Sequence, residues 1–385
     1  MYRSGLDIRK GIEQNWYEYL SKYANLFSSN EIHGSSPPSV FVGSYGYPKV
    51  GVGPMLPPIH GDTSLLDAPE RWLGKNLEEI VNYRLNLVRG IQKTGIEETS
   101  GRFIEGLHEL AMSSGTIDSE IKFLKNPLPL PSIDGQNAPF GPIGEIKSVK
   151  FSPNSSIKPI ENAYYDTDLK AEDAVMKLYN SGIEISKIQK CFSIGMFGKN
   201  RKLVPTKWSI TATDQIISND LMHNILEFDI IDRYNIFNFD HLGNLFSVIL
   251  FPHRWLFEMQ EAWHDKNSIG FGSDYETAKG IDHPPSITGA YFAGKLAVTE
   301  YLQKIKKQSG VMIFREIQPE YAVPVGVWQV REGVREAMTK HPKEAHSLDE
   351  AINLATKRMN ISKNEWLANG SMLKLVEQTS MSDFF

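Results

Sequence analysis

The chain has 385 residues, of which 41% are hydrophobic and 23% charged, and these ordinary values exclude wholesale disorder and a fibrous architecture. Its formal net charge is -5, whereas a protein that holds nucleic acid by itself is usually basic, so any DNA contact must be local or assisted by a partner. The single cysteine, Cys191, excludes an internal disulfide and a cysteine-rich zinc module.

The first section of the chain, residues 1–125, is predicted to mix α-helices and β-strands. Apolar residues at helical spacing predict an amphipathic helix over residues 8–27. Short strands are expected around a turn at residues 45–48, and two further helices follow. These strands cover residues 39–42 and 50–52, and the helices cover residues 77–88 and 102–112.

Prolines and glycines between residues 126 and 142 block regular structure, so this segment is predicted to be a connector. The main section follows over residues 143–377. Its strands are expected at residues 145–151, 246–251, 311–317 and 323–330, and its helices at residues 172–180, 289–306 and 333–340. Small residues along one side of the helix at 289–306 predict close packing on a neighbour. The whole pattern predicts an α+β (or α/β) fold, a mixed sheet layered with helices, in one large or two closely packed domains.

Two patterns of a serine followed by a glutamate mark helix starts near the end of the chain, Ser347 with Glu350 and Ser362 with Glu365. The last helix is expected to end near Glu377. Residues 378–385 are then predicted to be a short flexible tail, because nothing in their pattern would bury them in the body.

This tail holds Gln378, Met381, Phe384 and Phe385 in the arrangement glutamine, two residues, aliphatic, two residues, and two aromatics. A single 3₁₀ turn would bring the methionine and both phenylalanines together as one apolar plug, with the glutamine ahead of it to fix the register. The arrangement resembles the PCNA-interacting peptide motif, which implies a PCNA sliding clamp as partner. The alternative is that Phe384 and Phe385 fold back onto the protein's own surface.

Several phrases in the body resemble the archaeal Nre family of DNA-damage-response proteins. They are the segments at residues 38–43, 46–48, 53–55, 203–212, 289–295 and 324–332. The resemblance implies a DNA-repair role and a clamp-binding C-terminus. Some relatives begin with a cysteine-rich, zinc-like segment that this chain lacks, so no metal and no cofactor are expected.

The glycines of the turn at residues 43–47 would let its backbone approach a ligand, and Tyr45, Tyr47 and Lys49 could contact a base or a phosphate. A purely structural turn is the alternative. The densest basic and aromatic cluster of the sequence comprises Arg201, Lys202, Lys207 and Trp208, groups that commonly contact a nucleic-acid backbone. Its alternative is a solvated loop that enters a helix capped by Thr213 or Asp214.

Arginines supply the other candidates for nucleic-acid contact. Arg84 lies near Arg89, and Arg331 lies four positions before Arg335, so either pair could hold phosphates or form ordinary surface ion pairs. Arg254 follows an apolar strand, a position that often lines a crevice. Acids such as Asp229, Asp232 and Asp240 have no diagnostic metal spacing, and no catalytic residue can be identified.

Three hypotheses remain: a clamp-tethered repair factor that touches DNA, an enzyme that processes nucleic acid or nucleotides (a nuclease, or a nucleotidyl or ADP-ribosyl transferase), and a noncatalytic scaffold. An enzyme would gather Tyr45, Arg84, Lys207, Arg254 and Arg331 in one cleft. No run approaches the roughly 18 apolar residues of a membrane span, and the N-terminus lacks an apolar signal core, so we expect a cytoplasmic protein without a membrane partner.

Overall fold

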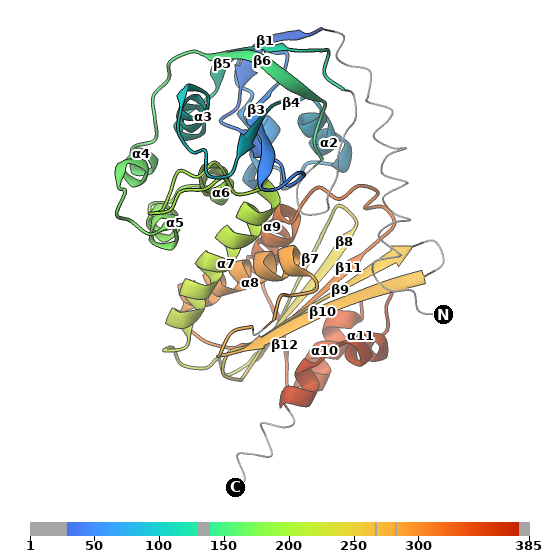
Figure 1. Cartoon of the computed structure of the whole chain (residues 1–385). Helices are drawn as coiled ribbons and strands as arrows, with labels where there is room; N and C mark the ends of the chain where they lie inside the picture. Colours follow the sequence, from blue (N-terminus) through green and yellow to red (C-terminus); the bar gives the residue numbers. More distant parts are fainter. Residues whose placement is uncertain (1–28, 129–138, 266–267, 282, 377–385) are drawn as a thin grey trace. The chain divides into compact units, whose positions relative to one another are not determined.

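The computed structural model describes residues 29–128, 139–265, 268–281 and 283–376. The described residues form two compact units (Figure 1). The N-terminal unit contains described residues from 29 to 217 and residues 323–326, and the C-terminal unit contains those from 218 to 322 and from 327 to 376. Each unit is built on a six-stranded mixed sheet with helices, which confirms the predicted α+β class.

The sheet of the N-terminal unit has the strand order β1-β5-β6-β4-β3-β2. Its strands are β1 (Glu31–Ser36), β2 (Val40–Val42), β3 (Lys49–Leu56), β4 (Val88–Gly95), β5 (Ile117–Phe123) and β6 (Ile143–Phe151). All neighbours are antiparallel except β4 and β6. Because β6 pairs with β4 and β5, the connector predicted at residues 126–142 falls inside this unit, and residues 129–138 lie outside the described residues.

Helices of the N-terminal unit are α2 (Leu77–Leu85), α3 (Arg102–Met112), α4 (Lys158–Tyr165), α5 (Ala171–Asn180), α6 (Ile185–Ser193) and the first part of α7 (Thr206–Ile225), with 3₁₀ turns η1 (Ser64–Asp67) and η2 (Pro69–Arg71). The start of α2 is fixed by a capping box between Asn76 and Glu79. In α3, Ile104, Leu107 and Ala111 recur at helical spacing and are buried.

The sheet of the C-terminal unit has the order β10-β9-β11-β8-β7-β12, with β9 and β11 parallel and the other neighbours antiparallel. Its strands are β7 (Tyr234–His241), β8 (Asn244–Phe251), β9 (Leu256–Asp265), β10 (Ser268–Thr277), β11 (Gly310–Ile317) and β12 (Lys343–Ala345). Its helices are α8 (Thr288–Ile305), α9 (Trp328–Ala337), α10 (Leu348–Thr356) and α11 (Lys363–Asn369).

Helices cover both faces of this sheet (Figure 1). On one face, a Cβ on Gly294 of α8 would lie 2.9 Å from Sδ of Met259 and 3.2 Å from Cδ1 of Ile313, so the predicted close packing is confirmed. On the other face, the ring of Trp366 lies 5.1 Å from that of Phe314 and 5.8 Å from that of Phe271. The predicted starts at Ser347 and Ser362 are confirmed as the N-caps of α10 and α11.

Some predicted elements were wrong. Residues 323–327 form no strand, because Pro324 cannot donate to a ladder and Gly326 takes a φ of 99°. The helix expected at residues 333–340 instead begins at Trp328. Likewise α7 begins at Thr206, so Thr213 and Asp214 are buried inside a helix rather than capping one. The helix predicted at residues 8–27 lies outside the described residues, and none of the described helices is long and apolar enough to cross a membrane.

Candidate functional site

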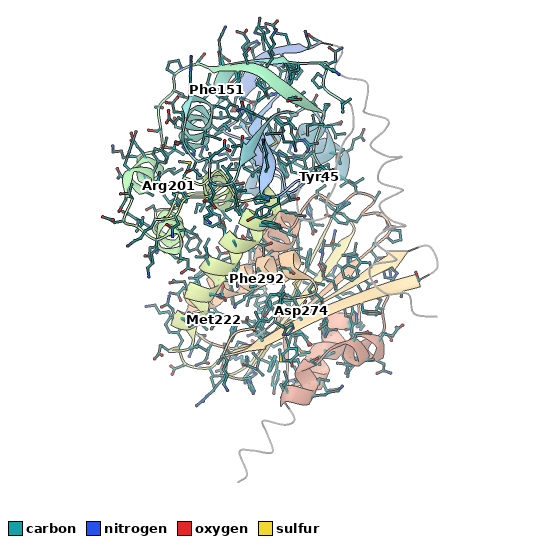
Figure 2. All side chains as sticks on the ribbon, viewed as in Figure 1. Tyr45, Phe151, Arg201, Met222, Asp274 and Phe292 are labelled. Atoms are coloured by element: carbon teal, nitrogen blue, oxygen red, sulfur yellow. The ribbon has the colours of Figure 1, made fainter. Side chains whose placement is uncertain are left out.

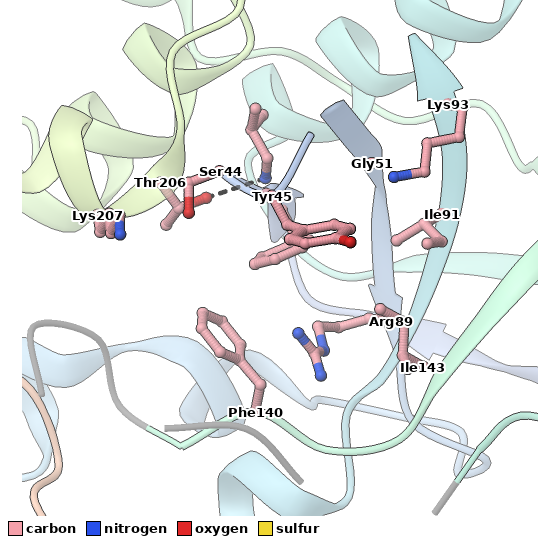
Figure 3. A pocket seen from close by; sticks show the side chains of 13 residues that line it. Ser44, Tyr45, Gly51, Arg89, Ile91, Lys93, Phe140, Ile143, Thr206 and Lys207 are labelled. Atoms are coloured by element: carbon pink, nitrogen blue, oxygen red, sulfur yellow. Dashed lines mark hydrogen bonds between the residues drawn. The ribbon is translucent and has the colours of Figure 1, made fainter. Parts of the chain in front are cut away.

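A cavity of about 270 Å³ opens in the N-terminal unit between the turn after β2, the strand β4 and the start of α7 (Figure 3). Its lining includes the turn residues Gly43, Ser44 and Tyr45, the strand residues Phe41, Gly51, Arg89, Ile91 and Lys93, and Phe140, Thr206 and Lys207. Tyr45 occupies the middle of this view, with Lys207 on one side and Lys93 on the other.

Backbone hydrogen bonds fix the turn that forms one side of the pocket. The amide of Gly43 donates to the carbonyl of Gly51 at 2.8 Å, and the amide of Lys49 donates to that of Gly46 at 2.9 Å. Gly46 has a φ of 82°, which a glycine adopts without steric cost. The amide of Val42, the last residue of β2, donates to Oγ1 of Thr206 at 3.0 Å, which ties the end of β2 to the start of α7.

The pairing of β3 with β4 forms another wall. Gly51 lies directly opposite Lys93 in this antiparallel register. Because strand residues two positions apart point to the same face, Arg89, Ile91 and Lys93 all face the pocket. A Cβ on Gly51 would lie 3.3 Å from Cδ1 of Ile91, so the missing side chain keeps this part of the cavity open.

An aromatic and cationic cluster closes the floor. The rings of Phe41 and Phe140 meet edge to face with centroids 4.9 Å apart. The guanidinium carbon of Arg89 lies 5.0 Å from the Phe41 centroid and 4.8 Å from that of Phe140, and its Nη2 donates to the carbonyl of Gly141 at 3.1 Å. Arg89 is buried. These contacts hold the floor in one arrangement.

The rim carries exposed aromatic rings. Tyr45 is 88% exposed, and the ammonium of Lys93 lies 5.6 Å from its centroid. Next to the lining residues, Tyr47 and Trp208 contact each other with centroids 5.3 Å apart and remain 50% and 44% exposed. These three rings stand on two segments far apart in the sequence, so the fold brings together the predicted turn and part of the predicted basic cluster.

Lys93 and Lys207 line the same pocket, and Lys49 follows its turn as the first residue of β3. Within the described part of the chain, no carboxylate forms an ion pair with Lys49, Lys93 or Lys207. None of the described lining residues is acidic. The rim therefore combines cations with exposed rings.

Two other residues that were predicted to contact nucleic acid interact with groups of the protein itself. Lys202 forms an ion pair with Glu97 at 2.9 Å, which raises the pKa of its ammonium. Arg201 donates to the carbonyl of Tyr164 and lies over that ring at 5.0 Å. Figure 2 shows Arg201 well away from Tyr45 within the N-terminal unit.

Arg84 is buried and forms an ion pair with Asp67, which also accepts from Lys190 at 2.8 Å. Burial raises the pKa of Asp67, but the two cations outweigh it, and the pKa lies below its ordinary value. Arg84 therefore forms a buried ion pair and is not available at the surface for a phosphate.

The remaining arginines that were predicted to contact nucleic acid belong to the C-terminal unit. Arg331 is buried with its Nε 3.4 Å from Glu332. Arg335 donates to both carboxylate oxygens of Glu300, each at 2.7 Å. Arg254 is exposed. Of the five residues that an enzyme was expected to gather, only Tyr45 and Lys207 line the described pocket.

Sequence reasoning missed Phe41, Lys93, Phe140 and Thr206 as pocket residues. The alternation of residues 89, 91 and 93 would have placed Lys93 beside Arg89 if β4 had been recognised as a strand. Phe140 comes from the segment predicted to be a connector, and no local pattern indicates its position.

One group among the described residues has metal-ligand spacing, namely Glu31, His33 and Glu120 on β1 and β5. The ammonium of Lys122 lies 3.0 Å from Oε1 of Glu31, so the group is already compensated by a cation. The acids singled out in the sequence form no such group within the described ranges.

The four defining tail residues, Gln378, Met381, Phe384 and Phe385, lie outside the described residues. The described chain ends close behind a fixed point. Met372 is buried, and Oε1 of Glu258 accepts from the amides of Ser371 at 2.6 Å and Met372 at 3.3 Å.

Comparison with known proteins gives a consistent result along the chain. The model of the archaeal Nre N-terminal region matches residues 11–269, and that of the archaeal Nre C-terminal region matches residues 276–384. The chain is 36% identical over 361 residues to the DNA repair protein NreB of Archaeoglobus fulgidus, covering 92% of each chain. It is 36% identical over 382 residues to the DNA repair protein NreA of the same organism, covering 95% of this chain and 94% of the relative.

A third relative is the DNA repair protein NreA of Haloferax volcanii, which is 29% identical over 394 residues, with 97% of this chain and 94% of the relative covered. No solved structure was found to match the chain.

Proposed function

The chain belongs to the archaeal Nre family, and we propose that it is a cytoplasmic DNA-repair protein that its last eight residues tether to the PCNA sliding clamp. The relatives that match it over nearly its whole length carry the name DNA repair protein. In this proposal the N-terminal unit contacts the DNA once the tail has bound the clamp.

The observation that carries the clamp proposal is the spacing of Gln378, Met381, Phe384 and Phe385. Their side chains suit a polar pocket and an adjoining apolar pocket on a partner. The residues before the tail are anchored on the C-terminal unit, because Glu258 accepts from the amides of Ser371 and Met372.

DNA contact is proposed for the pocket rim, where Tyr45, Tyr47 and Trp208 are exposed beside Lys49 and Lys207. Aromatic rings that stack on bases, combined with lysines that neutralise phosphates, are the usual means of binding single strands. A net charge of -5 disfavours DNA binding by the protein as a whole, so a local cluster of positive groups is what a DNA contact requires. Arg254 is exposed and remains a further candidate contact.

The clamp proposal is tested with purified clamp and the intact protein, by measuring affinity in a titration. Removing residues 378–385 is expected to abolish binding and to leave the thermal unfolding temperature almost unchanged. Phe384→Ala and Phe385→Ala are each expected to cost about 2 kcal/mol of affinity or more, as buried aromatic anchors do.

Ser382→Ala is the matched control, because it lies between the defining positions and should retain the affinity of the intact chain. Unchanged clamp binding by the truncated protein would contradict the proposal. A large loss of stability on truncation would show instead that the phenylalanines pack on the body.

A further inference from the structure

We propose that the pocket in the N-terminal unit holds one unstacked nucleotide of a single DNA strand, with the base inside and the neighbouring phosphates at the lysines of the rim. This inference rests on the proposed function, because that function makes DNA the partner. It adds the form of DNA that is bound and the side chains that hold it.

The size of the cavity limits the ligand. Small-molecule pockets commonly measure about 300 to 1,000 Å³, so this cavity of about 270 Å³ is just smaller than that range. Such a volume suits one base or a mononucleotide and is small for a dinucleotide. In a duplex the base faces are covered by stacking, so a base could enter only after it has left the stack.

The walls of the pocket suit the aromatic ring of any base. Phe41 and Phe140 line the floor in edge-to-face contact, and Arg89 lies over both rings and holds them in place. Tyr45 adds an exposed ring in the middle of the opening (Figure 3). Because every base has a π face, such walls bind bases without reading their identity.

The charges suit a phosphate. The ammonium groups of Lys93 and Lys207 belong to the lining on either side of Tyr45 (Figure 3). Unlike Lys202, which pairs with Glu97, neither forms an ion pair with a carboxylate of the described residues. The first turn of α7 begins at Thr206, and the positive end of its dipole adds to the attraction for an anion.

The test measures fluorescence anisotropy of a labelled deoxythymidine strand of about 12 nucleotides, a duplex of the same length and thymidine 5′-monophosphate as competitor. The full chain is compared with Tyr45→Ala and Lys93→Gln. Two matched controls in the same unit are Tyr165→Ala, a tyrosine that is 70% exposed, and Lys150→Gln, whose side chain is 74% exposed. Neither control residue lines the pocket.

We expect the single strand to bind better than the duplex. Tyr45→Ala and Lys93→Gln should each weaken strand binding by about tenfold, as loss of one stacked base or one phosphate contact does. Lys93→Gln should also lower the slope of log affinity against log salt by about 0.7, whereas Tyr45→Ala should leave it unchanged. Both controls should retain the affinity of the intact chain, and an unchanged unfolding temperature shows that the variants fold.

Strand binding that is unaffected by both pocket variants would overturn this inference and the assignment of the DNA contact to the rim, and it would leave the proposed clamp tether intact. Tight binding of thymidine 5′-monophosphate without strand binding would also overturn it, because the source of the nucleotide would then be a free small molecule. Failure to bind any DNA, with and without loaded clamp, would instead contradict the proposed DNA contact itself.

Discussion

Arg84 and Asp67 form an ion pair in the interior of the N-terminal unit, where their side chains are only 4% and 9% exposed. Lys190 supplies a second cation 2.8 Å from the same carboxylate. Removing one partner of a buried pair leaves uncompensated charge, so Asp67→Asn is expected to lower the free energy of unfolding by about 3 to 5 kcal/mol. Denaturant titration measures this loss. The exposed Asp168→Asn in the same unit should change it by less than about 0.5 kcal/mol.

The same carboxylate makes stability depend on pH. Burial raises the pKa of Asp67, but Arg84 and Lys190 outweigh burial, and the folded pKa lies below the ordinary value of 3.8. A lowered folded pKa means that the unfolded chain binds the proton more readily, so this stabilisation is complete above the unfolded pKa and disappears as pH falls through the folded one. Between about pH 5 and pH 3, the intact protein should therefore lose more unfolding free energy than Asp67→Asn does. Parallel losses would contradict the assignment.

A second buried pair lies in the C-terminal unit, where Nζ of Lys295 is 2.7 Å from Oε1 of Glu276. Tyr291 and Trp255 also donate to this carboxylate, at 2.9 and 3.0 Å. Lys295→Met is expected to cost about 3 to 5 kcal/mol, because it leaves the carboxylate without its cation.

Adding Glu276→Gln to Lys295→Met should recover at least about 1 kcal/mol of that loss. The amide is uncharged, its oxygen can still accept from Trp255, and its nitrogen can donate to the hydroxyl of Tyr291. Denaturant titration of both single variants and the double variant gives the coupling. Additive losses would show that charge is not what binds these two positions together.

The sequence predicted best where one face of an element is buried and the other is solvated. The helix α3 was predicted at its observed bounds, because its apolar residues recur at helical spacing. The strand β9 was missed because it buries Glu258, Gln260 and Glu261, and polar residues argue against a buried strand. The two carboxylates have partners at distant positions, because Glu258 accepts from the amide of Ser371 and Glu261 pairs with Arg315 on β11. Local pattern cannot supply that information.

The candidate site divides in the same way. The turn around Tyr45 could be predicted because glycine and proline mark it locally. The cavity could not, because it depends on Gly51 lying opposite Lys93 and on Phe140 reaching Arg89. The arginine candidates Arg84 and Arg335 form ion pairs with carboxylates of the protein itself, and composition alone does not distinguish such arginines from those that contact phosphates.

The single cysteine provides a probe of folding. Cys191 is fully buried, and burial raises the pKa of its thiol to about 11. Because the thiolate is the reactive form, the folded protein should not react with iodoacetamide at pH 8, whereas the urea-unfolded chain should take up one equivalent. Mass spectrometry distinguishes the two. Rapid modification of the folded protein would mean that α6 opens locally.

The last prediction concerns how the clamp changes DNA binding. A net charge of -5 opposes association with DNA at long range, and the lysines of the rim can neutralise only a few phosphates. The isolated protein should therefore bind DNA weakly and with strong dependence on salt.

A loaded clamp makes the second contact effectively intramolecular, at a concentration that can reach about millimolar for a short linker. Titrations of labelled DNA at two salt concentrations, with and without loaded clamp, should show tighter binding by the intact chain only when the clamp is present. The chain without residues 378–385 should gain nothing from the clamp. Lys207→Ala should weaken binding in both conditions by the same factor, because the tether changes the effective concentration and not the contacts. Tight, salt-insensitive binding by the truncated chain alone would contradict the tethering mechanism, since a site that strong would need no clamp to be occupied.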